Sequence, residues 1–296
     1  MSDFFTLALF SATLRMATPL IFAAMGGLIS ERSGIVNIAL EGMMLTGAFF
    51  AVAGTHWTGN PWLGLLLGVF ASGVAGAIHA FWCITLRANQ IVAGTAVNLI
   101  AAGLTAFLIQ LIWGRAGGTD SVTRLPDLEF LGGVNVLIPV ALLLVPAVYV
   151  GLFRTRRGLH VLAAGEHPQA AESVGIDVTR NRYVAVILSG VLAGLGGAFL
   201  SIGDLSYFTL DMTAGRGFIA LAAVIFGGWT PFGALGATLL FGAAAAVQIQ
   251  AQATSNFPVS SDLLVALPYL LTLIAITGVV RSAPAPEGLG KHATAH

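Results

Sequence analysis

Long apolar runs separated by short polar breaks make up most of the sequence. A helix that spans a bilayer needs about 20 mostly apolar residues, and nine runs approach or reach that length. They predict an all-α, polytopic membrane protein with about nine transmembrane or re-entrant helices. The runs cover residues 4–29, 35–53, 62–86, 91–113, 134–153, 183–203, 218–229, 232–247 and 263–280.

The order of the runs predicts a single transmembrane domain over residues 1–280, with one long polar loop at residues 158–182. Residues 281–296 are rich in Ala, Pro and Gly, and this composition predicts a disordered cytoplasmic tail. The run at residues 218–229 is too short to cross alone, and the sequence GGWTPFG follows it directly. We therefore expect a half-helix that packs inside protein and does not face lipid.

The arginines predict the orientation, because cytoplasmic loops are enriched in Lys and Arg. Five arginines flank the loop at residues 158–182, which is therefore assigned to the cytoplasm: Arg154, Arg156, Arg157, Arg180 and Arg182. Alternation of the runs then places four further basic residues inside, namely Arg32, Arg87, Arg281 and Lys291, and three outside, namely Arg115, Arg124 and Arg216. This assignment puts the N-terminus outside and the C-terminus inside.

Composition supports a membrane protein and excludes several other classes. Hydrophobic residues make up 57% of the chain and charged residues 9%, whereas soluble proteins carry about 25% charged residues. The 13 basic and 13 acidic residues cancel, and no basic stripe is present, so nucleic acid is not an expected partner. The single cysteine, Cys83, forms neither an intrachain disulfide nor a Cys-based zinc cluster.

ATP chemistry and catalysis are not expected on this chain. The only lysine is Lys291 in the tail, so no Walker A loop of the form GxxxxGK(S/T) exists, and any ATP must be bound by a partner subunit. The histidines have no HExxH spacing, and no metal or cofactor site is predicted. His79, alone in an apolar run, is expected to pack and to bond a neighbouring carbonyl.

Glu41 is the most unusual residue, because a carboxylate near the middle of a spanning segment costs about 2.5 to 3.5 kcal/mol. Asn37 precedes it by one helical turn, so both side chains would share one face. Two interpretations stay open: a polar wall of a translocation path, or a structural bond to Arg32 or to unwound backbone. Arg15 is a further possible partner for Glu41 inside the bundle.

Asn98, within the fourth run, is another candidate for the substrate path. Its neutral amide is suited to hydrogen-bonding a sugar or a base. The alternative is an interhelical hydrogen bond, which is the commoner role of an Asn in a membrane helix. Close pairs of glycines, such as Gly64 with Gly68 and Gly190 with Gly194, are interpreted as faces where helices approach closely.

The loop at residues 158–182 is too long for a tight turn and too polar for lipid. Pro168 is suited to the first position of a helix and Gly175 to its end, so the sequence predicts a short helix over residues 168–173. Such a helix is suited to docking in a groove of a partner protein. The alternative is a helix resting on lipid headgroups, but Ala170, Ala171 and Val174 would form a poor lipid anchor.

Three stretches resemble one known family. They are GLISERSGIVNIALEGMMLTGA at residues 27–48, AAGEHPQAAESVGIDV at 163–178 and GFIALAAVIFGGWTPFGALGA at 217–237. In this order they resemble permease subunits of bacterial ATP-binding-cassette importers, in the subgroup for branched-chain amino acids, ribose and nucleosides. SERSGIVNIALEGMM and ANQIVAGTAVNL are most similar to the shorter permease of nucleoside or simple-sugar importers. The resemblance runs from about Pro19 to Val280.

The resemblance implies a multisubunit machine in the bacterial inner membrane. Its other parts would be a cytoplasmic ATPase that binds ATP, a second, related permease (a heterodimer more than a homodimer) and an extracytoplasmic binding protein. It also implies that residues 165–176 dock on the ATPase, through Gly165, Glu166, His167, Pro168, Ala170, Ala171, Gly175 and Ile176. It identifies no catalytic residue. Asn37, Glu41 and Asn98 are substrate-path candidates by polarity and position.

Two other classes of function fit the sequence less well. A secondary transporter driven by an ion gradient needs acidic residues inside the membrane, and Glu41 alone lies well inside a run. That class also leaves the docking loop unexplained. An intramembrane enzyme needs an acid–base pair or a metal set, and neither is found in the sequence. For an importer, the expected cargo is a nucleoside first, then a simple sugar, then a branched-chain amino acid.

Overall fold

The computed structural model describes residues 7–129, 132–253 and 284–291. Apart from one two-stranded antiparallel hairpin, in which Asp127 pairs with Asn135, the regular structure of these residues is helical. The elements in chain order are α1 (Leu7–Arg32), α2 (Leu40–Thr58), α3 (Pro61–Ala80), the π-helical turn η2 (Phe81–Thr85), α4 (Gln90–Trp113), β1 (Asp127–Leu128), β2 (Val134–Asn135), α5 (Leu137–Phe153), α6 (Arg156–Glu166), α7 (Pro168–Ser173), α8 (Val178–Ala198), the π-helical turn η4 (Phe199–Leu205), α9 (Arg216–Phe226) and α10 (Pro231–Ala253).

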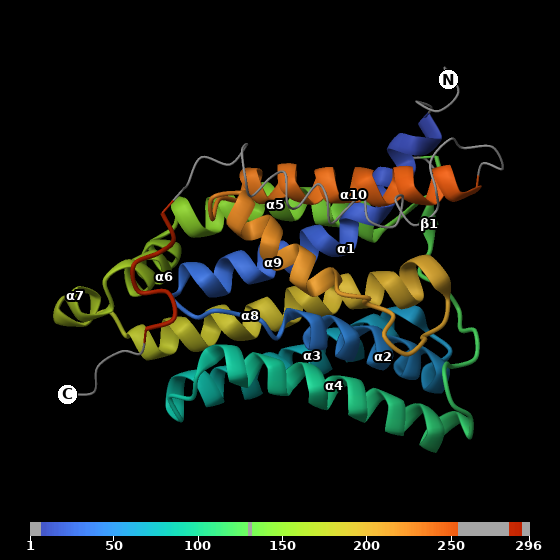
Figure 1. Ribbon diagram of the computed structural model, residues 1–296, viewed down its shortest axis with the longest axis horizontal. Helices are drawn as coiled ribbons and strands as arrows, with labels where there is room; N and C mark the ends of the chain where they lie inside the picture. The colour runs from blue at the N-terminus through green and yellow to red at the C-terminus, as the bar shows by residue number, and fades with distance from the viewer. Residues whose placement is uncertain (1–6, 130–131, 254–283, 292–296) are drawn as a thin grey trace.

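The long helices lie roughly side by side in stacked layers (Figure 1). α1 packs against α8, α10, α9 and α5, while α2 packs against α3, α8 and α4. α8 contacts both groups and therefore occupies the centre of the bundle. One end of the bundle carries α6, α7 and residues 284–291, and the opposite end carries the start of α1 and the hairpin (Figure 1). We call these the α7 end and the hairpin end.

Five described helical segments are long and apolar enough to cross a bilayer, and α5 with α6 makes a sixth if this bent pair is one span. The predicted runs match α1, α2, α3, α4, α5, α8, α9 and α10, and the ninth run, residues 263–280, lies outside the described residues. The run at residues 35–53 becomes helical only from Leu40, because Ser33–Ala39 form a turn and an extended link. α9 is short, as the half-helix prediction required.

Local sequence explains where several helices begin and end. The side chains of Asn60, Asn89 and Asp177 accept backbone N–H bonds in the first turns of α3, α4 and α8. Gly59 and Gly114 end α2 and α4 with left-handed φ angles of 69° and 66°. These caps are short polar breaks in the apolar sequence, so the pattern of breaks determines most helix ends.

Glycines allow α8 to lie close to its neighbours. A Cβ atom at Gly47 would lie 2.5 Å from the Cα of Gly194, and a Cβ at Gly190 would lie 2.6 Å from the Ser72 carbonyl oxygen. The expectation that these small residues mark close helix contacts is therefore confirmed. Ser72 also donates its hydroxyl to the carbonyls of Met43 and Gly190, which joins three helices at one point.

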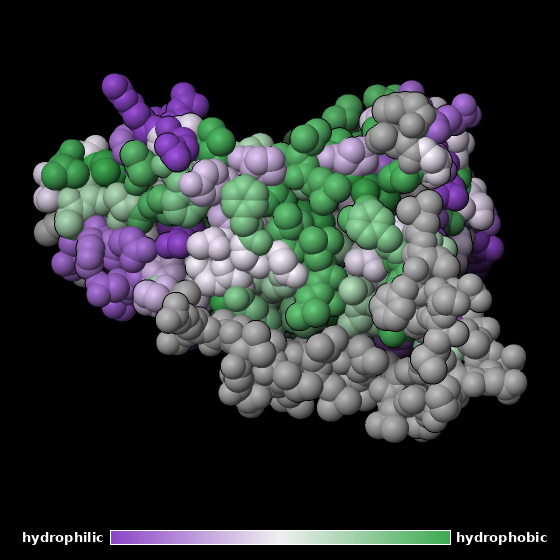
Figure 2. Space-filling view, turned by 90° about the horizontal axis from the view of Figure 1, so that it is seen from above, coloured by the Kyte–Doolittle hydropathy of each residue, from purple (hydrophilic) through white to green (hydrophobic). Residues whose placement is uncertain are grey.

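Surface polarity follows the length of the bundle. Hydrophobic residues cover the middle of the face seen in Figure 2, and hydrophilic residues collect at both of its ends. Large apolar side chains such as Leu99 and Phe70 are about 70% exposed on the outside of the bundle. A surface of this kind is solvated by lipid tails, so the chain is an integral membrane protein.

Candidate functional site

The predicted docking segment lies at the α7 end. α6 leaves α5 at a bend of 74°, and α7 projects beyond the bundle (Figure 1). Gly165 and Glu166 close α6, His167 separates the two helices, and Pro168 begins α7. Gly175, with a φ of +83°, follows the end of α7. The short helix predicted from the sequence is present, and α6 before it was not predicted.

α7 has one packed face and one open face. Ala171 is buried against Ala164, and Ile176 packs on the same small cluster. Ala170 is exposed and Val174 is 74% exposed. The open face is therefore small and mildly apolar, which suits contact with a protein groove better than insertion into lipid.

Four side chains, Glu31, Arg32, Glu166 and Trp229, connect this segment to the rest of the bundle, and we call them the coupling junction. Arg32 donates from Nε to the Trp229 carbonyl oxygen at 2.8 Å and from Nη1 to the Glu166 carboxylate at 3.3 Å. The Trp229 indole N–H donates to the Glu31 carboxylate at 2.5 Å. One arginine at the end of α1 thus contacts both the docking segment and the turn after α9.

Gly165 permits this contact by having no side chain. A Cβ atom at this position would lie 2.1 Å from the Arg32 carbonyl oxygen and 3.1 Å from the Gly34 amide nitrogen. Real Cβ atoms do not approach backbone oxygen that closely, so any other residue would push α6 away from α1. The glycine therefore fixes how closely the docking segment approaches the end of α1.

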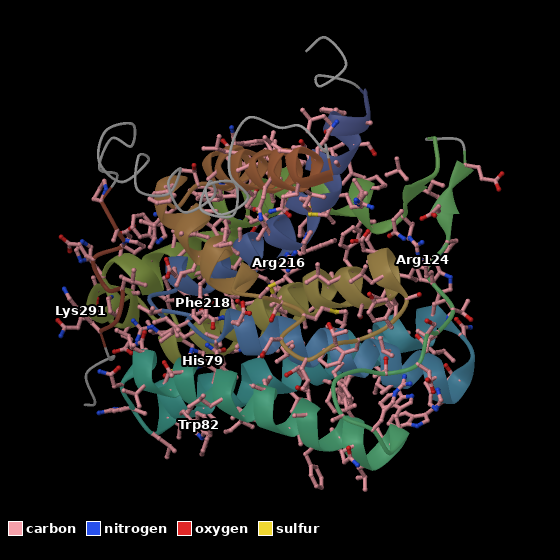
Figure 3. The ribbon with its side chains drawn as sticks, turned by 45° about the vertical axis from the view of Figure 1, so that its right-hand side comes forward. His79, Trp82, Arg124, Arg216, Phe218 and Lys291 are labelled. Atoms are coloured by element: carbon pink, nitrogen blue, oxygen red, sulfur yellow. The ribbon has the colours of Figure 1, made fainter. Side chains whose placement is uncertain are left out.

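Residues 284–291 lie across the same place, and we call them the C-terminal strap. The Gly288 amide donates to the Gly165 carbonyl at 2.8 Å, and the Gly290 amide donates to the Gly34 carbonyl at 3.0 Å. Arg182 donates to the Lys291 carbonyl at 3.1 Å. Disorder was expected for the whole tail, but these eight residues form turns and bonds with three separate parts of the chain. Figure 3 places Lys291 at the α7 end.

A second group of polar contacts lies where α2 and α9 begin, and we call Glu41, Asn98, Gly215 and Gly217 the central junction. The Glu41 carboxylate accepts the Gly215 amide at 2.8 Å and the Gly217 amide at 2.6 Å. Both amides belong to the start of α9, where a helix has free N–H groups and a partial positive charge. Of the two interpretations of Glu41, the structure therefore contains the bond to backbone.

Asn98 and Asn37 also bond to neighbouring helices. Asn98 accepts the Gly42 amide at 2.7 Å and donates to the Ile38 carbonyl at 3.0 Å, so it holds the first turn of α2. Asn37 is fully buried and donates to the Ser189 hydroxyl at 2.8 Å. The structure brings Asn98 and Glu41 together at the first turn of α2, and it ties Asn37 to α8.

Two smaller expectations have opposite outcomes. Arg15 does not pair with Glu41: its guanidinium lies 3.6 Å from the Asp204 carboxylate, because α1 runs beside η4 at that depth. His79 is fully buried, and its Nε2 lies 3.3 Å from the Val36 carbonyl oxygen, so its predicted packing and carbonyl bond are confirmed.

Arg216 occupies a different place from the one expected. The orientation argument put it in an outer loop, but it is the first residue of α9 and lies near the middle of the bundle beside Phe218 (Figure 3). Its Nη1 donates to the carbonyls of Met212 and Thr213, so the guanidinium closes the turn that leads into α9.

Sequence reasoning missed Glu31, Trp229 and Arg182 as functional candidates. Glu31 and Arg182 are each 2% exposed, although both lie next to polar breaks where exposure is the ordinary expectation for a charge. Arg182 donates to the carbonyls of Ser33, Ala164 and Lys291, and so joins four segments. One sequence signal could have indicated these residues: the SERSG and GGWTP motifs are longer than a simple turn needs.

Comparison with known proteins identifies the kind of molecule. Residues 9–276 match the family described as branched-chain amino acid transport system / permease component. The chain is similar to the guanosine ABC transporter permease protein NupQ of Bacillus subtilis, with 40% identity over 94% of each chain. It is also similar to the putative glucose ABC transporter permease protein TsgC13 of Haloferax volcanii, with 39% identity over 85% of this chain and 80% of that one.

One solved structure has the same overall fold. It is PsaBC from Streptococcus pneumoniae in complex with Fab, at 14% identity and a TM-score of 0.51, and the match covers 97% of each chain. At this identity the likeness concerns the fold alone. It agrees with a bundle of long helices.

Proposed function

The chain belongs to the branched-chain amino acid transport system / permease component family, and from this premise we propose that it forms the translocation path of an ATP-driven importer for nucleosides. As a member of this family it is a transport permease and not an enzyme. The observation that carries the proposal is the coupling junction, where the three family-like motifs, far apart in sequence, meet at the docking segment.

We propose that α7 and the break before it dock on a cytoplasmic ATPase. Arginines concentrate at the α7 end, so the positive-inside rule supports a cytoplasmic location for this surface. The chain has no Walker A loop, and an ATPase partner supplies the missing energy source. Gly165, Glu166, His167 and Pro168 form the inner part of the proposed contact. Ala170 and Gly175 are exposed on its outer part, and Ala171 and Ile176 pack beneath them.

α9 is suited to carry movement from this surface to the centre of the bundle. Its last turn leads to Trp229, which bonds to Arg32, and its first turn bonds to Glu41. An 11-residue helix is about 16 Å long, which equals about half the thickness of the hydrocarbon core. When ATP binding moves the docking segment, Arg32 would shift α9 and thereby change the position of the start of α2.

We propose that the path borders the central junction. Glu41 and Asn98 are partly exposed, whereas Asn37 is fully buried, so the first two are nearer to the cargo. All three act as positioning residues: Asn98 and Glu41 bond the backbone of α2 and α9, and Asn37 bonds the Ser189 hydroxyl on α8. A polar cargo would therefore pass the starts of α2 and α9, whose backbone is held in place by these hydrogen bonds.

Nucleosides are the proposed cargo because NupQ is named for guanosine and matches this chain over nearly its whole length. A simple sugar is the main alternative, since the name of TsgC13 refers to glucose and the identity is nearly equal. A branched-chain amino acid is the third candidate, from the family description. The proposed partners are the ATPase, a second, related permease that forms a heterodimer, and an extracytoplasmic binding protein.

The test is affinity purification of the tagged chain in mild detergent, with mass spectrometry and an ATPase assay of the eluate. Recovery of an ATPase and a second permease supports the importer. Vesicles that contain the complex should then take up a labelled nucleoside faster than a labelled sugar or branched-chain amino acid. A chain that transports alone under an ion gradient would contradict the proposal and support an ion-coupled secondary transporter.

A second experiment tests the docking surface. Replacement of residues 166–169 by a Gly/Ser linker should remove ATPase association and uptake while membrane insertion stays intact. The matched control replaces residues 115–118, at the hairpin end, by a linker of the same length. Normal uptake after the first replacement would exclude residues 166–169 as the docking surface.

A further inference from the structure

A cavity with a volume of about 750 Å³ lies at the α7 end, between α5, α6 and α8. Its size is within the range of about 300–1,000 Å³ that is usual for small-molecule pockets. α5, α6 and α8 supply most of its lining, and α1 contributes Ile29. The cavity borders the docking surface at Gly175 and Ile176, and no residue of the central junction lines it.

The lining has two chemically different parts. Toward the middle of the bundle it is apolar, with Leu144 and Val148 on α5 facing Leu188 and Leu192 on α8. At the α7 end it is polar and basic, with Arg157, His160, Arg180 and Asn181. The cavity therefore combines an apolar slot along two membrane helices with a cationic mouth at the level where they leave the membrane.

Within the described residues the mouth keeps a net positive charge, because Arg157 and Arg180 outnumber the one carboxylate of the lining, Asp177. Arg157 and Arg180 are exposed, and neither side chain has an ion pair or hydrogen bond there. Asp177 also lines the cavity, but its carboxylate accepts the Arg180 backbone amide at 2.8 Å as a helix cap. α6 and α8 both begin at this mouth, and the partial positive charge at a helix start adds to the attraction for an anion.

We propose that this cavity binds one anionic phospholipid of the cytoplasmic leaflet. Its phosphate would lie at Arg157 and Arg180, and an acyl chain would lie between α5 and α8. A water-soluble anion would leave the apolar slot unused, and a neutral lipid would leave the two arginines without a partner. Basic pockets between membrane helices on the cytoplasmic side are suited to anionic headgroups.

Because of where the cavity lies, a lipid bound in it would affect the docking segment. α6 forms one wall, and its far end carries Gly165 and Glu166 of the docking segment. A lipid held between α5, α6 and α8 stabilises the 74° bend from which α6 departs. Anionic lipid would thus support the geometry of the docking segment without touching the cargo path.

The binding test uses the complete complex in nanodiscs with two photoactivatable lipids, phosphatidylglycerol and phosphatidylcholine, that carry the same acyl label. Peptides from α5 and α8 should be labelled roughly 10- to 30-fold more by phosphatidylglycerol, because each nearby arginine contributes about 1 kcal/mol toward an anionic lipid. The double variant Arg157→Gln/Arg180→Gln should fall to the phosphatidylcholine level. The matched control Arg154→Gln/Arg156→Gln removes the same charge at the same end but outside the cavity, and should keep the preference.

Two further arms decide what occupies the cavity. Leu188→Trp fills the slot while keeping both arginines, so it should reduce labelling even if the arginine variant does not insert. Excess glycerol 3-phosphate should not displace the lipid; displacement would overturn the proposal in favour of a soluble anion site. Equal labelling by the two lipids would also overturn it. A disulfide test in a Cys83→Ser background gives a further way to overturn the proposal. If Leu188→Cys and Leu271→Cys form a disulfide in high yield, the chain's own last run fills the slot and no lipid is needed there.

Discussion

The two junctions at the ends of α9 are built from different kinds of hydrogen bond. In the central junction, side chains bond to backbone: Glu41 accepts two amides of α9, and Asn98 bonds an amide and a carbonyl of α2. In the coupling junction, charged side chains bond to one another and to Trp229. The Glu166 side chain there is 42% exposed, so water competes with its bond to Arg32.

This difference predicts that the central junction is rigid, which we call a fixed point, and that the coupling junction can move. The Glu41 carboxylate accepts two free amides at a helix start, and removing it leaves both amides without their acceptor. An ion pair in partial contact with water is weaker and exchanges partners easily. We therefore expect the central junction to contribute mainly to stability and the coupling junction mainly to transport.

The strongest test of the comparison is Glu41→Ala. It leaves two backbone amides without an acceptor, and hydrogen bonds to charged groups contribute about 1.5–3 kcal/mol each, so stability should fall by at least about 3 kcal/mol. Thermal unfolding in detergent measures the loss, and uptake should fall with it. Glu41→Gln keeps one acceptor oxygen and should give an intermediate value.

The control for that change is Glu129→Ala, which removes an exposed carboxylate at the hairpin end. It should leave the thermal midpoint unchanged. If Glu41→Ala unfolds at the wild-type temperature and transports normally, then the central junction is not a fixed point.

Gly165→Ala should have the next largest effect, and mainly on transport. Within a helix Ala is usually more stable than Gly by about 0.5–1 kcal/mol, but here its Cβ would clash with the Arg32 carbonyl and push α6 outward. Overpacking of this kind costs about 1–3 kcal/mol. ATP-driven uptake should fall several-fold while insertion and subunit recovery persist.

Gly103→Ala in α4 serves as the matched control, because an added Cβ there meets nothing within 4 Å. Uptake by this variant should equal that of the wild type. Equal loss in both variants would show that the Gly165 contact has no special part in coupling.

Removal of the C-terminal strap should have a moderate effect. Truncation before Pro284 deletes the partners of the Gly165 and Gly34 carbonyls and one of the three partners of Arg182. At about 1 kcal/mol per bond, the local loss is about 1–3 kcal/mol, and hydrogen exchange at residues 163–167 should speed up accordingly. Truncation after Lys291 keeps the strap and is the control; equal exchange in the two truncations would contradict a stabilising role.

The smallest expected effect concerns the ion pair between His167 and Glu287 at 3.1 Å. Both side chains are about two-thirds exposed, so Glu287→Gln should change stability by about 0.2–1 kcal/mol at most. A double-mutant cycle with His167→Gln isolates the pair, and its coupling energy should vanish in high salt. A larger coupling energy that does not depend on salt would mean that this pair is rigid, like the central junction.

Much of the fold followed from the sequence. The spacing of apolar runs located eight of the described helices, and Pro168 with Gly175 located α7. These features are local, because an apolar run, a proline or a cap acts within its own segment. α6 was missed because its polar, arginine-rich sequence carries no apolar run.

The partners of the charged residues did not follow from the sequence. The sequence shows that the Glu41 carboxylate is energetically unfavourable within a membrane segment. It leaves the partner open between Arg15, Arg32 and backbone, because a helix at this place is compatible with all three. Glu31 and Arg182 looked exposed and are buried, and the strap looked disordered and is bonded. Each of these outcomes depends on segments more than 100 positions apart in sequence.

The sequence by itself therefore determined a helical membrane protein, the position of its helices, the short helix α7 and the resemblance to transport permeases. Only the tertiary structure decided which charges are buried, that α9 links two unlike junctions, and that a basic mouth opens into an apolar slot. The physical reason is the separation along the chain between the groups that interact. Hydrophobic spans and caps are set by neighbours along the chain, whereas a buried charge is satisfied by groups that only folding brings within hydrogen-bond distance.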